Sequence, residues 1–306
     1  MDMYFLKLLS EIRNPVLTTI NMVITSLGGG TLYVALLCLI YWCIDKKFAY
    51  RLGIIYILSG MAVHSLKVIF RIPRPWVRDP SFNVVKAAKP GAGGYSFPSG
   101  HTQNTTAFLS TLAYRCKKPL LKLLCYMGIF LMMFSRMYLG VHTPTDVGVA
   151  FLLTLLISLY VNHYGENYSI DIKTIHKINI FMVLISAAVT ILVIYLYATV
   201  PELPVSKLIG TVKFTGAAFG FIIGLYIEKN YIRFNEKATT FPKQILKFAI
   251  GIIVSLALHK GLSFIIKTFF AAILPLYFFE YALLFVFVIC VYPIFIKKFF
   301  TDEFYL

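Results

Sequence analysis

Charged residues are scarce in this sequence, and hydrophobic residues take their place. Only 14% of the 306 residues are Asp, Glu, Lys or Arg, whereas 59% are hydrophobic. The mean hydropathy is +0.78, and many of the apolar runs are long enough to span a membrane. This composition excludes a soluble globular domain and predicts an all-α integral membrane protein.

Acidic residues are especially few, with 13 Asp and Glu against 29 Lys and Arg, so the formal net charge is +16. In a soluble protein such an excess would suggest a nucleic acid partner. Here most of it lies in short loops between apolar runs, where it sets the membrane topology and meets anionic lipid headgroups. No RNA- or DNA-binding motif accompanies it, and we therefore expect no nucleic acid partner.

Cysteine pairs and carboxylate clusters are also lacking. The five cysteines are odd in number, lie in or beside apolar runs and form no C-x-x-C pair, which excludes a disulfide framework and a zinc site. No cluster of carboxylates offers the oxygen ligands that magnesium needs, so we expect neither a metal nor another cofactor. A cleavable signal peptide is not expected, because Asp2 and Glu11 occupy the place of a basic leader region.

The apolar runs predict a polytopic helical bundle of about nine transmembrane helices. These helices are expected near residues 31–45, 50–70, 99–115, 119–139, 146–163, 178–198, 209–228, 245–266 and 274–296. Residues 3–13 have helical periodicity with their charges on one side, which is typical of an amphipathic helix in the membrane interface. The run from Pro15 to Leu27 is ended by three glycines, and it either spans the membrane or lies in the interface.

Three groups of polar residues interrupt the apolar pattern of the first half, residues 1–163, whereas residues 164–306 contain four predicted helices and no motif. In chain order the groups read K-x6-R-P, P-S-G-H and S-R-x5-H-x3-D. Their members are Lys67, Arg74, Pro75, Pro98, Ser99, Gly100, His101, Ser135, Arg136, His142 and Asp146. Burying such groups in a bilayer is unfavourable, so they indicate a functional site.

The first two groups have the chemistry of a phosphate site. Lys67 offers a point charge and Arg74 a forked set of donors, and the prolines beside Arg74 stiffen its backbone. Ser99 is a good N-cap, and Gly100 lets a phosphate oxygen approach the backbone N–H groups at the start of a helix. The alternative is that the cations reach up to lipid headgroups from a helix end and that Ser99 caps an ordinary helix.

His142 and Asp146 are separated by four residues, one turn of a helix. The carboxylate could accept the Nδ1–H of the imidazole, which would fix the tautomer and leave Nε2 free to attack. This spacing favours His142 over His101 as a nucleophile, because only His142 has a carboxylate nearby. The alternative is a stray histidine at a helix end, with an aspartate favoured by the helix dipole.

The three groups together resemble the three-part signature of the type 2 phosphatidic acid phosphatase (PAP2) superfamily of lipid phosphatases, over about residues 60–150. The resemblance implies that His142 is the nucleophile and forms a phosphohistidine, which water then hydrolyses. It implies that His101 protonates the leaving group and that Asp146 orients His142. The phosphoryl oxygens would be held by Lys67, Arg74, Ser99, Gly100 and Arg136.

The same resemblance implies a substrate that is a membrane lipid phosphate. Candidates are a polyprenyl diphosphate, phosphatidate, phosphatidylglycerol phosphate and a sphingoid phosphate. Two alternatives to a phosphatase remain at this point. The first is a phosphotransferase that passes the phosphoryl group from His142 to a lipid or a sugar. The second is a lipid transporter or scaffold without catalysis, against which the complete set of motif residues argues.

Lysine and arginine gather in the loops that share one side of the membrane if the nine helices alternate. These loops include residues 45–51, 115–122, 229–243 and 297–298. By the positive-inside rule that side is cytoplasmic. The motif residues then lie on the other side, which predicts a multi-pass protein of the cell membrane with its site on the outer, extracytoplasmic face.

Glu280 lies inside the last apolar run. An unpaired carboxylate at that depth is costly, so it is expected to face the protein interior and to find a cation. The nearest cations in sequence are Lys260 and Lys267. A structural ion pair between the last two helices is favoured over a contact with a lipid headgroup.

Overall fold

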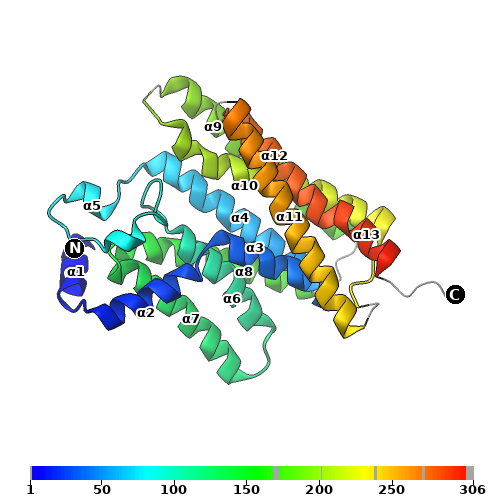
Figure 1. Cartoon of the computed structure of the whole chain (residues 1–306), viewed down its shortest axis with the longest axis horizontal. Helices are drawn as coiled ribbons and strands as arrows, with labels where there is room; N and C mark the ends of the chain where they lie inside the picture. Colours follow the sequence, from blue (N-terminus) through cyan, green and yellow to red (C-terminus); the bar gives the residue numbers. More distant parts are fainter. Residues whose placement is uncertain (1, 168–171, 201, 238–239, 271–272, 301–306) are drawn as a thin grey trace. The chain divides into compact units, whose positions relative to one another are not determined.

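The computed structural model describes residues 2–167, 172–200, 202–237, 240–270 and 273–300, and within these ranges every regular element is a helix (Figure 1). The predicted all-α fold is thus confirmed. Packing divides the chain into two compact units. The first comprises Met1–Tyr33 and Ile54–Asn167, and the second Val34–Gly53 and Tyr168–Leu306. Residues 34–53 therefore pack with the second half, although the functional division predicted at residue 163 stays a prediction.

The first unit is built mainly from helices that surround α6. Its elements are α1 (Asp2–Glu11), α2 (Pro15–Ser26), the first turn of α3 (Gly30–Leu39), the second part of α4 (Lys46–Phe70), α5 (Pro75–Arg78), a short 3-10 turn (Lys86–Ala88), α6 (Gly100–Arg115), α7 (Pro119–Tyr138) and α8 (Pro144–Asn167). Helix α6 packs against both α7 and α8, and α2 packs against α7.

Helix α6 is unusually polar for a helix among apolar neighbours. Its buried side chains include Gln103, Asn104, Thr105, Ser110 and Thr111. Neighbouring elements satisfy several of them: Gln103 Nε2 donates to Ser59 Oγ at 2.8 Å, Tyr33 donates to Thr105 Oγ1 at 2.8 Å, and Ser110 donates to Ser158 Oγ at 2.7 Å. Such hydrogen bonds between helices satisfy polar side chains that are kept away from water. Because its polar side chains bond to several neighbouring elements, α6 is a central helix of this unit.

The second unit consists of residues 34–53 and the helices of the second half. Its elements are the rest of α3, a π-helical turn (Ile40–Ile44), the start of α4, α9 (Ile172–Thr199), α10 (Val205–Ile227), a π-helical turn (Glu228–Ile232), α11 (Phe241–Phe269), α12 (Leu274–Val286), a π-helical turn (Phe287–Val291) and α13 (Tyr292–Phe299). Gly216 and Gly220 bring α10 against the backbone of α12. A Cβ on either glycine would lie 2.2 Å from a carbonyl oxygen of α12. Small residues at this spacing permit close helix packing in membranes.

The carboxylate of Glu280 on α12 is buried and faces His259 on α11. Its Oε1 lies 2.9 Å from Nδ1 of the imidazole. The expected partners Lys260 and Lys267 were therefore wrong. His259 precedes Lys260 by one residue, so the two side chains point about 100° apart around the helix. The face of α11 that meets α12, rather than distance along the sequence, therefore decides which side chain pairs with Glu280.

Seven helices within the described residues are long and apolar enough to cross a membrane, or eight if the bent pair Pro15–Ser26 and Gly30–Ile44 forms one span. The predicted count of nine is not confirmed. Helix α6 has only 16 residues and a polar sequence, and the segment expected near 31–45 belongs to the pair that bends by 49°. The helix expected at residues 3–13 is present as α1, and its location in the membrane interface stays a prediction.

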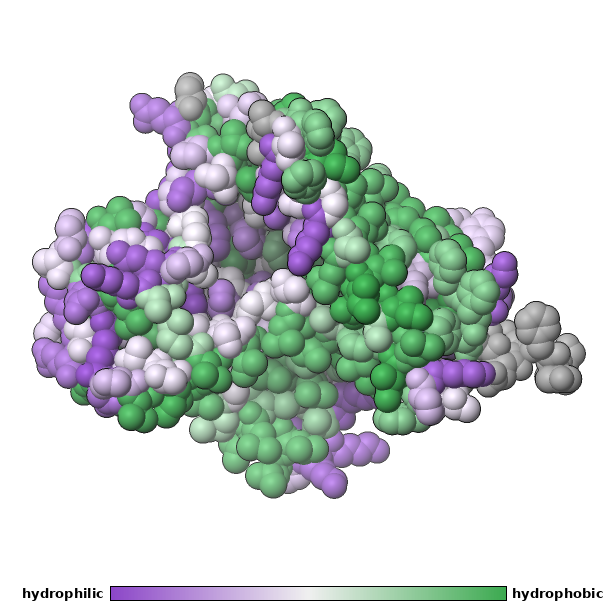
Figure 2. Space-filling view, viewed as in Figure 1, coloured by the Kyte–Doolittle hydropathy of each residue, from purple (hydrophilic) through white to green (hydrophobic). Residues whose placement is uncertain are grey.

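The surfaces over α7 and over α11 are apolar, as Figure 2 shows. On α7 the exposed side chains include Leu120, Leu123, Leu124 and Phe130, and on α11 they include Ile253, Phe264 and Phe269. Apolar side chains that find no protein partner are typical of helices that face lipid. The long helices that pass the hydropathy criterion are therefore consistent with spans through a bilayer.

Candidate active site

Helix α4 ends just before the second cation of the first polar group. Arg71 follows the helix with a left-handed backbone (φ +51°), and its amide donates to Lys67 O at 3.0 Å. A left-handed residue after the last turn is a common way for a helix to stop. The chain then continues to Arg74, which is extended (φ −65°, ψ 154°) and precedes the short helix α5. This geometry turns Arg74 back toward the end of α4.

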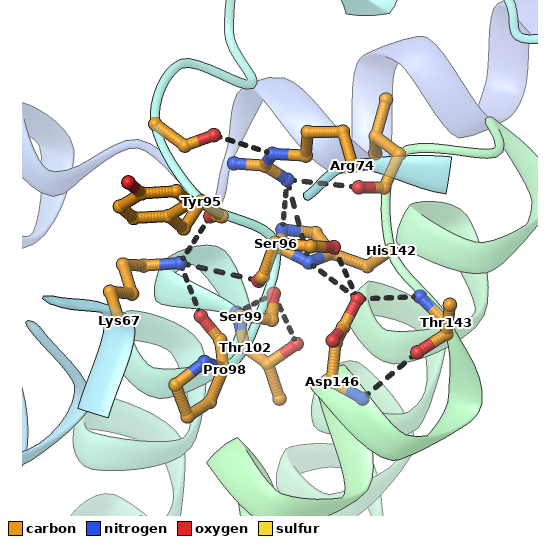
Figure 3. A network of polar contacts seen from close by, with 12 residues as sticks. Lys67, Arg74, Tyr95, Ser96, Pro98, Ser99, Thr102, His142, Thr143 and Asp146 are labelled. Atoms are coloured by element: carbon orange, nitrogen blue, oxygen red, sulfur yellow. Dashed lines mark hydrogen bonds and ion pairs between the residues drawn. The ribbon is translucent and has the colours of Figure 1, made fainter. Parts of the chain in front are cut away.

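Backbone carbonyls of the loop before α6 hold Lys67. Its ammonium donates to Tyr95 O at 3.0 Å, to Ser96 O at 3.3 Å and to Pro98 O (Figure 3). The side chain is only 9% exposed. Carbonyl oxygens are neutral, so the positive charge of Lys67 is solvated but not cancelled.

Arg74 is held in the same way and also reaches His142. Its Nη2 donates to Gly93 O at 2.9 Å, its Nε to Gly94 O at 3.3 Å and its Nη1 to Val141 O at 2.9 Å. Nη1 also lies 2.9 Å from His142 Nε2. A guanidinium can only donate, so Nε2 of this imidazole is the acceptor and carries a lone pair.

The other ring nitrogen of His142 faces Asp146. Nδ1 lies 3.4 Å from Asp146 Oδ2, which is a loose contact rather than a short hydrogen bond (Figure 3). With the lone pair on Nε2, the proton of the neutral ring is on Nδ1 and points to the carboxylate. The predicted juxtaposition of the two residues is therefore present in the structure, and it leaves Nε2 directed at the cation of Arg74.

Asp146 is itself fixed by several donors. Its Oδ2 accepts the backbone N–H of Thr143 at 2.8 Å and the hydroxyl of Ser96. The amide of Asp146 lies 3.3 Å from Thr143 Oγ1, which completes a reciprocal cap at the start of α8. The carbonyl of Asp146 accepts the Ser99 amide at 3.0 Å and so ties α8 to the second polar group.

The start of α6 has the features of an anion site. Ser99 is the N-cap, and its hydroxyl accepts the Thr102 amide, as predicted for this position. A Cβ placed on Gly100 would meet no atom within 4 Å, so open space lies beside the first residue of the helix. Unpaired N–H groups and the helix dipole favour an anion at such an end.

Arg136, on the last turn of α7, is a buried cation with free donors. The residue is 1% exposed, and its Nη1 donates to Thr25 Oγ1 at 2.5 Å. Nε and Nη2 are buried and find no hydrogen-bond partner among the described residues. The carbonyl of Arg136 accepts the amides of Val141 at 3.1 Å and His142 at 3.3 Å, which binds the backbone of the third polar group together.

His101 lies one residue into α6 and is close enough to His142 for an electrostatic interaction. The His101 side chain packs against the break at residues 27–29, which is the short non-helical link between α2 and α3. A Cβ placed on Gly28 would lie 2.5 Å from His101 Cδ2 and 3.0 Å from His101 Cβ. The imidazole of His101 therefore fits only because residue 28 has no side chain.

The buried position of His142 keeps its imidazole neutral. Burial lowers the pKa of His142 well below its ordinary value, and the charges of Arg74, Arg136 and Lys67 lower that pKa further. A neutral imidazole is the form that attacks as a nucleophile. The same cations that would bind a phosphoryl group therefore also keep the imidazole of His142 in its neutral, nucleophilic form.

The structure brings all eight predicted site residues into the first unit, at neighbouring ends of α4, α6, α7 and α8. Sequence reasoning did not identify Ser96, Thr25 or Gly28. Ser96 directly precedes the second polar group, but nothing marks its hydroxyl as a partner of Asp146. Thr25 lies 111 residues from Arg136, and no local pattern connects the two.

Two protein-family patterns match this chain. The pattern described as PAP2 superfamily matches residues 48–169, which contain all the predicted site residues. The pattern described as PAP2 superfamily phosphatase, transmembrane extension, matches residues 212–303. The matches thus fall in both halves of the chain.

Individual proteins match parts of the chain. Sphingosine-1-phosphate phosphatase 2 of Homo sapiens is 33% identical over 138 residues, or 43% of this chain and 34% of that protein. Phosphatidylglycerophosphatase B of Bacillus subtilis is 30% identical over 166 residues, or 51% of this chain and 78% of that protein. The chain spans only 31–39% of the length of the mammalian sphingosine-1-phosphate phosphatases it matches. The crystal structure of Aquifex aeolicus LpxE has 26% identity and a TM-score of 0.49, and the match covers 53% of this chain and 95% of that one.

Proposed function

This chain belongs to the PAP2 superfamily, and we propose that it is a lipid-phosphate phosphatase that works through a phosphohistidine on His142. It is a multi-span membrane protein. The observation that carries the proposal is the pair His142–Asp146, placed against the buried cations Lys67, Arg74 and Arg136. A cationic site of this kind stabilises the charge that develops on a transferred phosphoryl group.

In the first step, Nε2 of His142 attacks phosphorus and the bond from phosphorus to the leaving oxygen breaks. His101, which takes up a proton when the anionic phosphoryl group binds among the cations, gives it to that oxygen, so the lipid leaves as an alcohol, or as a monophosphate if the substrate is a diphosphate. Asp146 holds Nδ1–H and stabilises the positive charge that the ring acquires. Lys67 and Arg74 replace hydrogen bonds to neutral carbonyls with hydrogen bonds to phosphoryl oxygens, and Arg136 uses its free donors to bind such oxygens.

In the second step, water attacks phosphorus and the bond from phosphorus to Nε2 breaks. His101 is now neutral and accepts a proton from the water, which returns both histidines to their starting forms. Ser99 and Gly100 would offer backbone donors to the phosphoryl oxygens at the start of α6. The products are inorganic phosphate and free enzyme, and no step needs a metal ion, because the cations supply the charge.

The substrate class is a phosphomonoester or diphosphate of a membrane lipid. The named relatives act, by their names, on sphingosine 1-phosphate and on phosphatidylglycerophosphate. Phosphatidate and polyprenyl diphosphates present the same terminal phosphoryl group to the site. In this proposal residues 1–163 carry out the chemistry, and residues 164–306 form an extension of the membrane domain.

Phosphate release from a panel of these lipids, by detergent-solubilised protein in EDTA, tests the proposed function. We expect hydrolysis of at least one lipid phosphate without added metal, and inhibition by vanadate, which resembles the five-coordinate phosphoryl transition state. An absolute requirement for magnesium would contradict the proposed cationic mechanism. Radiolabelled phosphate that appears in a new organic-soluble product would instead reveal transfer to a lipid acceptor.

We further propose that the site faces the outer side of the cell membrane, because the Lys- and Arg-rich loops without motif residues share the opposite side if the nine helices predicted from the sequence alternate. A single cysteine that replaces exposed Lys89 should react with a membrane-impermeant thiol reagent in intact cells. One that replaces exposed Lys117 should react only after the membrane is opened. Both variants need a background in which the five native cysteines are replaced, and the reverse labelling pattern would place the reaction on the cytoplasmic leaflet.

A further inference from the structure

The break at residues 27–29, between α2 and α3, lies beside two of the proposed catalytic groups. Thr25 is on the last turn of α2 and Gly28 is in the break, and both precede the residues 48–169 that the family pattern matches. We propose that these two residues form a fourth part of the active site, in which Thr25 positions Arg136 and Gly28 positions His101. This inference rests on the proposed phosphatase function.

Thr25 determines the direction of the Arg136 guanidinium. The hydrogen bond from Nη1 to Thr25 Oγ1, at 2.5 Å, is the one side-chain hydrogen bond that the described residues provide to this buried group. A guanidinium is planar and rigid, so holding Nη1 restricts how the group can rotate and thereby the directions of Nε and Nη2. Those two atoms have no partner, and they are the donors that remain for a phosphoryl oxygen.

Gly28 determines how close the backbone comes to His101. A Cβ at this residue would meet His101 Cδ2 at 2.5 Å and Met132 Sδ at 2.9 Å, both far inside normal contact distance. The break cannot easily retreat, because Asn104 Nδ2 on α6 donates to Gly28 O at 3.0 Å. A methyl group at residue 28 would therefore push the imidazole of His101 away from its present position.

Gly29 provides a matched control for this argument. A Cβ at Gly29 would meet only Ser26 O, at an ordinary 3.6 Å. Gly28 and Gly29 are neighbours in the same break and lose the same backbone freedom when they are replaced with alanine. A difference between the two alanine variants therefore reports the contacts of residue 28 with His101 and Met132 and not the flexibility of the break.

The two positioning residues act on opposite ends of the phosphorus–oxygen bond that breaks, Thr25 through Arg136 and Gly28 through His101. Arg136 binds the phosphoryl group, which is common to every substrate. His101 protonates the leaving oxygen, and this matters most when the leaving group is a poor one, such as the alkoxide of a lipid. A disturbed Arg136 should therefore affect all substrates, whereas a displaced His101 should affect lipid phosphates much more than p-nitrophenyl phosphate.

The test measures kcat and KM of wild type, Gly28→Ala, Gly29→Ala, Thr25→Val and Thr25→Ser, with a lipid phosphate and with p-nitrophenyl phosphate. For Gly28→Ala we expect kcat on the lipid to fall by about 10- to 100-fold, with a much smaller loss on the activated ester. This is less than the roughly 10²- to 10⁴-fold that general acid catalysis contributes, because His101 is displaced and not removed. For Thr25→Val we expect losses of about 10-fold on both substrates and weaker inhibition by vanadate, because a hydrogen bond to a charged group is lost. Thr25→Ser should restore both properties, and Gly29→Ala should resemble wild type.

The outcomes separate failure of this inference from failure of the proposed function. If wild type hydrolyses no lipid phosphate, the proposed function is wrong. If wild type is active and both Gly28→Ala and Thr25→Val match Gly29→Ala, the positioning role is overturned. It is also overturned if the two variants lower only the melting temperature and leave kcat and KM of the folded protein unchanged. Should Gly28→Ala fail to fold, the valine and serine variants of Thr25 still decide the role of the break.

Discussion

Replacing His142 with alanine should abolish turnover and, with it, the phosphorylated form of the enzyme. The structure directs the lone pair of His142 Nε2 at Arg74 and places Asp146 behind the ring. His101, the other histidine of the proposed site, has no such carboxylate partner among the described residues, so it is not positioned to take over the attack. Loss of a nucleophile in comparable hydrolases lowers kcat by about 10⁶-fold.

Rapid quenching of wild type with a radiolabelled lipid phosphate should trap phosphate on the protein. Phosphohistidine survives alkali and is lost in acid, whereas phosphoserine behaves in the opposite way, so the stability of the label identifies its site. His163→Ala is a suitable control, because His163 is an exposed residue on α8, away from the polar groups. An alkali-stable label that persists in His142→Ala, or a label that maps to His101, would exchange the roles proposed for the two histidines.

Replacing Asp146 with asparagine should lower kcat by about 10³- to 10⁴-fold with little change in KM, as loss of the orienting carboxylate does in other histidine-dependent enzymes. The shape of the side chain is kept, and its oxygen can still accept the Thr143 amide that Asp146 accepts at 2.8 Å. The negative charge that stabilises the phosphorylated imidazole is lost. An amide group turned toward Nδ1 would also favour the other tautomer, in which Nε2 carries the proton and cannot attack.

Ser96→Ala provides the matched comparison for Asp146→Asn. It removes one donor to Oδ2 of Asp146 but keeps the charge. We expect a loss of about 10-fold, the lower end of the effect of one hydrogen bond to a charged group, because Oδ2 keeps the Thr143 amide as a donor. Equal losses in the two variants would mean that the position of the carboxylate, and not its charge, is what matters. A large rise in KM in Asp146→Asn with unchanged kcat would contradict an orienting role.

The resting site suggests how phosphate binding is made favourable. Lys67 and Arg74 are bonded to neutral carbonyls of the loop at residues 93–98, and Arg136 keeps free donors. Replacing a neutral acceptor with a phosphoryl oxygen strengthens each bond, because charge-assisted hydrogen bonds are about twice as strong as neutral ones. The cations are buried in advance, so their reorganisation on binding is small.

Those parts of the site that depend on neighbours in sequence were predicted correctly. Ser99 caps α6, and His142 meets Asp146 one turn later. Each of these contacts spans at most four residues, and the geometry of a helix end determines them almost completely. The spacing of the polar groups in the chain therefore sufficed to identify the candidate nucleophile and the residue that orients it.

Predictions failed or stayed open where helices meet. Glu280 pairs with His259 and not with the lysines that lie nearest in sequence. The nine expected spans included α6 as an ordinary transmembrane helix, although its polar residues are buried against neighbouring helices. Residues 34–53 pack with the second half, although the predicted functional division at residue 163 stays a prediction. Hydropathy reports how apolar a segment is, and it does not report which helix lies beside it.

By itself, the sequence determined that this protein is a helical membrane protein with a cationic histidine site. The length and apolarity of the runs, the helix caps and the i, i+4 spacing of His142 and Asp146 are local properties, and local geometry fixes their consequences. Only the tertiary structure decided that Thr25 holds Arg136 and that Gly28 makes room for His101. These contacts join segments more than 70 residues apart along the chain, as the distance of 76 residues from Gly28 to Asn104 illustrates. They exist because of how α2, α6 and α7 pack, and no short-range rule predicts that packing.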